Sequence, residues 1–237
     1  MSRTSAHGSQ LAAEAANRGW QYSPAGDDLR LPGRWKWSLH IDHPFAVHGH
    51  FTGMDRRTQA RDVLSGTTAA GQQFWTFWYP YTAGHQHGTF VTRTVAFVWT
   101  AVPLPAASAL RRGSMGTRAV MSALNELAAR GLDQVPLTDA QARSFGRLYG
   151  WPIGSAEFRS LYLVRADDRQ AAEWLAGPTT QQRLLAHPAP PISLTTNGAD
   201  ILAWSDYGGS HLSRVEDYDI STIDAMLEVL DTVELPP

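Results

Sequence analysis

The chain has 237 residues, a formal net charge of −2 and no cysteine, and charged residues make up 18% of it. The lack of cysteine excludes a disulfide scaffold, thiolate metal sites and cysteine nucleophiles. The sequence has no apolar run of about 18 residues, so no membrane span is expected, and its start lacks a signal-peptide pattern. These features predict a cytoplasmic globular protein that can bury a sizeable core.

The charge is unevenly distributed along the chain. Residues 200–237 carry nine acidic side chains against one arginine, a net charge of −8, whereas residues 1–199 carry +6. The acidic segment has helical periodicity, which favours an acidic helix docked within the protein over a disordered acidic tail. Uniform basic character is absent, so nucleic acid is not expected as a partner.

The amino-terminal part predicts a helix followed by a hairpin. Ser9 is a suitable N-cap for an Ala-rich helix ending at Arg18, and residues 1–8 have the small, polar composition of a disordered terminus. On both sides of a short turn in residues 35–51, the odd positions are apolar apart from Gly49, and the even positions are polar apart from Ala46. This alternation predicts a hairpin with one packed face and one basic, histidine-bearing face.

Three more strands are predicted at residues 62–67, 73–81 and 89–102, with a turn at 70–71 and a Gly- and His-containing loop at 82–88. The middle strand has aromatic residues on both faces, which is typical of a strand in the centre of a sheet that is covered on both sides. The order of these segments predicts an antiparallel meander.

The second half of the chain is predicted to be mainly helical, with a strand and a second hairpin. The first elements are a helix over 117–130, a helix capped by Thr138 and ending at Leu148, and a strand over 157–165. Two helices follow, one from Asp167 or Asp168 to Leu175 and one capped by Thr179 or Thr180, and then a hairpin over 192–204 that turns at Asn197-Gly198. The final helix has Ser221 and Asp224 as its capping box and an apolar stripe of Ile223, Met226, Leu227, Leu230 and Val233.

The fold class predicted from these elements is α+β, an antiparallel sheet of meander and hairpins with helices packed on it. Residues 9–237 are expected to form a single domain. A Pro-, Ala- and Gly-containing stretch at 103–116 could divide this domain into lobes 9–105 and 106–237.

Histidines are the first candidates for chemistry, because six of the nine lie between positions 40 and 87. They are His40, His43, His48, His50, His85 and His87. Residues i and i+2 of a strand share a face, so His48 and His50 could ligate a divalent metal together with His85 or His87. No zinc-hydrolase motif accompanies them, so a solvated polar face without a cofactor is the favoured interpretation. Another possibility is a pH-sensitive anionic contact through Arg34, Lys36 and His40 with these histidines.

The aromatic strands are the second candidate. Trp75, Trp78 and Trp99 could line a groove for a small apolar ligand. Aromatic residues on both faces of a strand favour a packed core over an exposed groove. Other reaction types lack their motifs: GxSxG, GxxxxGK[ST] and GxGxxG are all absent.

Three stretches also resemble a known group of proteins: the Ala-rich helix running into Arg18-Gly19-Trp20, the aromatic strand over 71–81, and the segment from Glu157-Phe158 to Trp174-Leu175. Their order is similar to that in a diffuse group of uncharacterised bacterial, mainly actinobacterial, proteins, some of which are membrane-anchored. The resemblance implies an α+β fold and no known activity.

Three functions are therefore weighed. The favoured one is an intracellular binding or interaction protein without catalytic activity, acting on a protein partner or as a homodimer. The alternatives are a metal-dependent enzyme that uses the His40–His87 cluster, and a small carrier of an apolar ligand.

Overall fold

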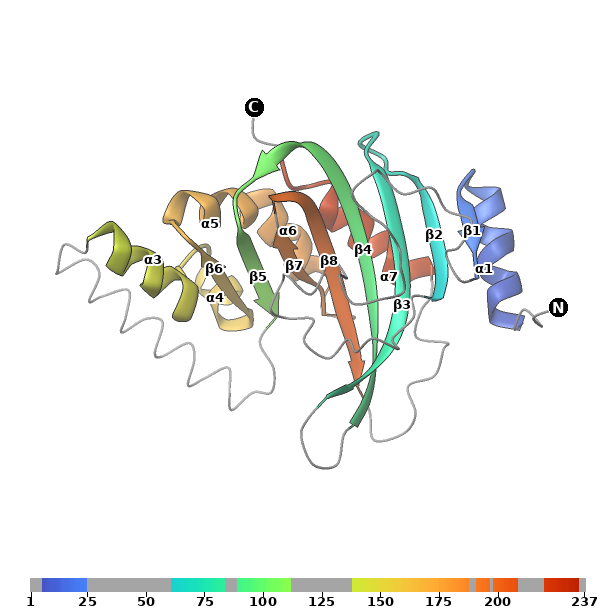
Figure 1. The fold of residues 1–237 in the computed structure, drawn as a ribbon, viewed down its shortest axis with the longest axis horizontal. Helices are drawn as coiled ribbons and strands as arrows, with labels where there is room; N and C mark the ends of the chain where they lie inside the picture. The colour runs from blue at the N-terminus through green and yellow to red at the C-terminus, as the bar shows by residue number, and fades with distance from the viewer. Residues whose placement is uncertain are drawn as a thin grey trace. The chain divides into compact units, whose positions relative to one another are not determined.

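A computed structural model of the chain describes residues 6–24, 61–83, 89–111, 138–187, 191–196, 198–208 and 220–234. Within these ranges the structure is an eight-stranded antiparallel sheet, in the order β1-β2-β3-β4-β8-β7-β5-β6, with six helices (Figure 1). The predicted α+β class is confirmed. The predicted hairpin at 35–51 and helix at 117–130 lie outside the described residues.

The chain divides into two compact units, and each draws on residues that are far apart in the sequence. Unit 1 consists of residues 1–99 and 202–231, and unit 2 of residues 100–201 and 232–237. The prediction of a single domain with possible lobes 9–105 and 106–237 stays a prediction.

Unit 1 is built on the meander that the sequence predicts. Its elements are α1 (Ala6–Asn17), β1 (Gln21–Ser23), β2 (Arg61–Thr67), β3 (Gln73–Ala83), the first part of β4 (Thr89–Leu104), the second part of β8 (Gly198–Gly208) and α7 (Ile220–Leu230). Helix α1 begins at Ala6, earlier than predicted from Ser9. Strand β4 continues through Pro103, where the sequence predicts its end.

The aromatic strand β3 has a buried side chain at each described aromatic position. Phe74, Trp75, Phe77 and Trp78 are all at most 5% exposed, and successive residues of a strand point to opposite faces. Trp75 stacks on Phe97 of β4 with 5.3 Å between the ring centroids. Strand β3 is thus covered on both faces, as its sequence predicts.

The acidic carboxy-terminal helix α7 is docked within unit 1. Four residues of its predicted apolar stripe, Ile223, Met226, Leu227 and Leu230, lie in α7 and are buried; the fifth, Val233, follows the helix in unit 2 and is also buried. The Arg18 guanidinium donates to the Asp224 carboxylate at 2.5 Å, which matches a basic group of the first part with an acidic group of the last. Ser221 lies inside α7, which already includes Ile220, so the predicted capping-box start at Ser221 is wrong.

Unit 2 contains a short sheet and four helices among its described residues. Its elements are β5 (Ala107–Arg111), α3 (Asp139–Leu148), α4 (Ala156–Leu161), β6 (Tyr162–Ala166), α5 (Arg169–Leu175), α6 (Pro178–Ala186) and β7 (Ser193–Thr196), with the ends of β4 and β8. Thr138 forms a capping box with Gln141, and Asp168 caps α5, both as predicted.

Three predictions in unit 2 are corrected by the structure. The segment predicted as a strand over 157–165 is helical up to Leu161, because the Ser155 hydroxyl accepts from the Phe158 amide and caps α4. Helix α6 begins at Pro178 after Gly177 rather than at a threonine cap, since proline has no amide hydrogen to satisfy at a helix start. Residues 107–111, for which the sequence predicts no strand, form β5.

The outer edge of β6 is covered by residues that come just after α3. The Trp151 amide donates to the Val164 carbonyl at 2.7 Å, and its indole Nε1 donates to the Ala166 carbonyl at 3.2 Å. Gly146 and Gly150 permit this approach, because a Cβ at either would lie 2.6 Å or less from a neighbouring atom.

Helices that could cross a membrane are not found in the described part of the chain: none is both long and apolar enough.

Candidate functional site

Most of the residues singled out from the sequence lie outside the described ranges. This holds for Arg34, Lys36 and all six clustered histidines, and the Trp99 side chain is likewise not described. Within the described residues, no group of three His, Asp or Glu side chains is placed to hold a metal ion. The predicted metal site therefore stays a prediction.

Trp75 and Trp78, the two candidate groove residues that are described, both contact other parts of unit 1. Trp75 is stacked on Phe97, and the Trp78 indole Nε1 donates to the Asp62 carboxylate at 2.8 Å. Their exposed fractions are 5% and 4%. Both rings are therefore buried in the packing of the unit 1 sheet.

Asp62 is the centre of a hydrogen-bonded cluster that also includes Tyr22 and Trp78. The Tyr22 hydroxyl donates to one oxygen of the Asp62 carboxylate at 2.5 Å, and the Trp78 indole donates to the other. Asp62 has a φ of 49°, in the left-handed region that an aspartate adopts at a cost, and lies where the β2–β3 register shifts. The Arg61 guanidinium lies 5.4 Å from the centre of the Trp78 ring.

The same cluster joins the two ends of segment 25–60, which carries four of the clustered histidines. The Asp62 amide donates to the Pro24 carbonyl at 3.0 Å. Strand β1 ends and β2 begins at one end of the unit 1 sheet, and β3 ends and β4 begins at the same end, since all three pairs are antiparallel. Segments 25–60 and 84–88 are therefore both attached to this end.

We expect the stability of unit 1 to fall at alkaline pH because of Tyr22. Burial raises the pKa of the Tyr22 hydroxyl above its ordinary value near 10, and the hydrogen bond and negative charge of Asp62 raise it further. The folded state then holds a proton that the unfolded state loses, so stability is present below about pH 10 and falls as the pH rises above it. In urea unfolding between pH 8 and 11, the free energy of unfolding should fall less steeply with pH for Tyr22→Phe than for the wild type. Equal slopes would contradict a raised pKa of Tyr22 as the cause.

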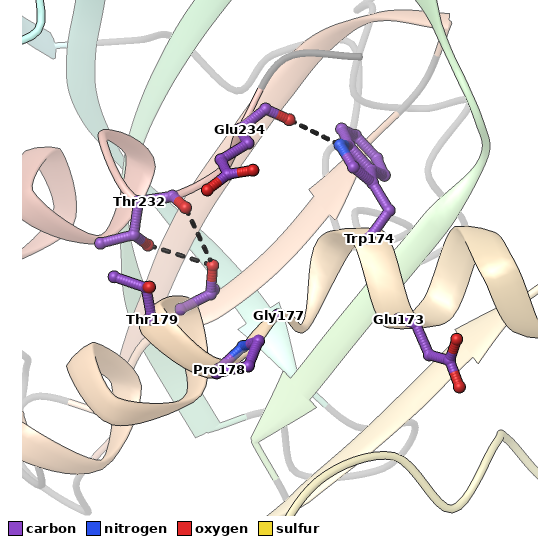
Figure 2. Close-up of a pocket in the computed structure, with 8 residues that line it drawn as sticks. Glu173, Trp174, Gly177, Pro178, Thr179, Thr232 and Glu234 are labelled. Carbon is purple, nitrogen blue, oxygen red and sulfur yellow. Dashed lines mark hydrogen bonds between the residues drawn. The ribbon is translucent and has the colours of Figure 1, made fainter.

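A pocket within unit 2 is the other candidate site, and its lining differs from the Asp62 cluster of unit 1. It measures about 210 Å³ and lies between the end of α5, the start of α6 and the segment after α7 (Figure 2). Its lining residues are Glu173, Trp174, Gly177, Pro178, Thr179, Thr180, Thr232 and Glu234. The lining holds an aromatic ring, hydroxyls and carboxylates but no histidine, lysine or arginine, so it offers binding groups without a general base of the histidine type.

Hydrogen bonds between distant residues hold the pocket walls in place. The Trp174 indole Nε1 donates to the Glu234 backbone carbonyl at 2.6 Å. The buried Thr180 hydroxyl donates to the Thr232 carbonyl at 3.3 Å and lies 3.2 Å from the Thr232 hydroxyl, as the dashed lines in Figure 2 show. The ring of Trp174, which is half-buried, is thus a fixed wall.

The two carboxylates of the pocket are directed differently. Figure 2 shows the Glu234 carboxylate turned toward the space between Trp174 and Thr179, and the Glu173 carboxylate turned away from it. Glu173 instead accepts from Arg169 Nε at 2.8 Å, one helical turn earlier on α5.

Sequence reasoning did not single out this pocket. Its walls are contacts between residues 52 and 60 positions apart, and neither Trp174 nor Glu234 belongs to a motif. The one available signal is Trp174 itself, a large aromatic residue near the end of a short helix that is otherwise buried through alanines and leucine.

Comparison with known proteins gives one distant structural likeness. No family model matches the chain, and no curated protein does. The crystal structure of the mycobacterial trehalose monomycolate transport factor A, TtfA, is similar to it, with 17% sequence identity, 97% of each chain covered and a TM-score of 0.44. A likeness at this level carries no inference about function.

Proposed function

We propose that this protein is a non-catalytic binding protein and that it takes a small ligand in the unit 2 pocket. The observation that carries the proposal is the hydrogen bond from the Trp174 indole to the Glu234 backbone carbonyl, which fixes an aromatic wall of a pocket that carboxylates and hydroxyls also line. Preformed concave sites with one aromatic wall and a few polar groups are typical of small-molecule recognition. Trp75 and Trp78 are engaged in protein contacts, so the proposal locates the ligand at Trp174 instead.

The test is a screen of metabolite-sized compounds against the full chain, read from the indole N–H signals in NMR spectra of protein labelled at tryptophan. A saturable ligand should shift the Trp174 signal, and Trp174→Ala should weaken its binding by about tenfold or more. Tyr149→Ala is the matched control, because Tyr149 is an exposed aromatic residue of unit 2 that does not line the pocket. If no compound binds saturably, or binding is indifferent to Trp174, the proposal fails.

The predicted protein partner or homodimer is part of the same proposal, as a second form of binding. Light scattering on the purified chain checks the homodimer: a dimer mass that persists on dilution supports it, and a monomer mass at all concentrations contradicts it.

Metal binding by the clustered histidines is the second candidate function. It is favoured by the attachment of segments 25–60 and 84–88 to the same end of the unit 1 sheet. Elemental analysis of protein purified without a histidine tag tests it. About one equivalent of a divalent metal is expected, reduced by the double variant His48→Ala/His50→Ala; less than a tenth of an equivalent would contradict it.

A further inference from the structure

We infer that the ligand of the unit 2 pocket is an organic cation, bound through an ammonium group between Trp174 and Glu234. This inference rests on the proposed function and adds the chemical class of the ligand.

The charge of the pocket lining favours a cation. Two glutamates line the pocket and no basic residue does. Arg169 already pairs with Glu173, whose carboxylate Figure 2 shows turned away from the pocket. Among the described residues Glu234 makes no ion pair, so its carboxylate is the charge that an entering ligand meets. An anionic ligand would be repelled, while a cation would find a partner.

Two other tryptophan rings of this chain already contact a cation. Arg18 lies 4.9 Å from the centre of the Trp20 ring, and Arg61 lies 5.4 Å from that of Trp78. Both distances are typical of cation–π contacts, and tryptophan is the strongest of the aromatic partners. Within the described ranges, Trp174 has no such cation on its ring although it borders a pocket with a carboxylate.

One hydrogen bond links the Trp174 ring to the Glu234 backbone. The Trp174 indole donates to the backbone carbonyl of Glu234 at 2.6 Å, and both residues line the pocket. Figure 2 shows the Glu234 carboxylate turned into the pocket space beside Trp174, and the ammonium group is placed in this space. Pro178 also lines the pocket and offers apolar contact to the carbon atoms attached to the ammonium group.

The experiment compares choline with its neutral carbon isostere, 3,3-dimethylbutan-1-ol, by titration of the wild-type chain with NMR detection of the tryptophan indole signals. Choline should bind at least about tenfold more tightly, and added salt should weaken it. A peptide with a single lysine is titrated in parallel: tighter binding of the peptide assigns the ammonium group to a protein partner, and tighter binding of choline assigns it to a small organic cation.

Two glutamate variants make a matched pair. Glu234→Gln keeps the backbone carbonyl that Trp174 contacts, so the pocket wall stays while choline binding should fall by about fivefold or more. Glu173→Gln removes an equal charge from the same lining and should leave choline binding within about twofold, since that carboxylate is paired with Arg169. Thermal melts confirm that both variants fold.

The outcomes separate the two proposals. If the neutral isostere binds as well as choline, or if the two glutamate variants behave alike, the cation inference is overturned while the pocket remains a binding site. If a neutral or anionic compound shifts the Trp174 signal and neither choline nor the lysine peptide does, the inference is again overturned. If nothing binds, both it and the proposed function fail.

Discussion

Replacing Asp62 by alanine is expected to lower the free energy of unfolding of unit 1 by about 3 kcal/mol. The substitution removes the acceptor for the Tyr22 hydroxyl and the Trp78 indole, and hydrogen bonds to a charged group contribute about 1.5–3 kcal/mol each when buried and less when partly exposed, as here. Alanine also keeps the left-handed backbone only at a cost of about 1–2 kcal/mol. Urea unfolding followed by tryptophan fluorescence measures the loss.

Two further variants separate the causes of that loss. Asp62→Asn tolerates the left-handed backbone and still offers one carbonyl oxygen, so we expect it to lose about half as much stability. Asp62→Gly relieves the backbone but loses both hydrogen bonds, so it should fall between the two. If the Asp62→Ala, Asp62→Asn and Asp62→Gly variants all had the same free energy of unfolding, the hydrogen bonds of Asp62 would not hold this part of the sheet.

The second large effect is expected at Gly146, where helix propensity favours alanine but the packing against Trp151 disfavours it. Gly146 lies inside α3, and replacing a helical glycine by alanine ordinarily stabilises by about 1 kcal/mol. Here a Cβ would lie 2.2 Å from the Trp151 indole nitrogen and 2.5 Å from the Ala166 carbonyl oxygen. Trp151 or the helix must move, so we expect Gly146→Ala to destabilise unit 2 by about 1–3 kcal/mol.

Ser144→Ala is the control on the same helix. Ser144 is exposed, so its replacement should stabilise by a few tenths of a kcal/mol through helix propensity alone. Hydrogen exchange at the Trp151 amide, which donates to the Val164 carbonyl, reports on the cover of β6 directly and should accelerate for Gly146→Ala only. Stabilisation by both variants would contradict the close packing of α3 on Trp151.

Local chemistry made several elements predictable from the sequence. Thr138 and Asp168 each cap a helix through a contact with a residue fewer than four positions further along the chain, so a short stretch of sequence is enough to predict each helix start. Both predictions are confirmed. The strand at 73–81 was recognisable from aromatic residues on both faces, which only a central strand can bury.

Other features depend on contacts that no local pattern encodes. The alternation of apolar residues from Phe158 to Tyr162 predicts a strand, but the Ser155 cap makes the first part of this segment helical. The Phe158 ring on the helix stacks on the Tyr162 ring of the following strand, with 4.7 Å between the ring centroids. The Asp62 cluster joins residues 16 and 40 positions apart, and the pocket joins residues 60 apart. Such sites become visible only once the chain is folded.

The cover on β6 also limits how further chains can attach to this sheet. A strand that adds to an open edge must hydrogen-bond to its outward backbone groups, which is how exposed edges recruit other chains and start fibres. On β6 the outward carbonyls of Val164 and Ala166 already accept from Trp151. A chain arriving at this edge would first have to displace Trp151, so the edge resists polymerisation by strand addition.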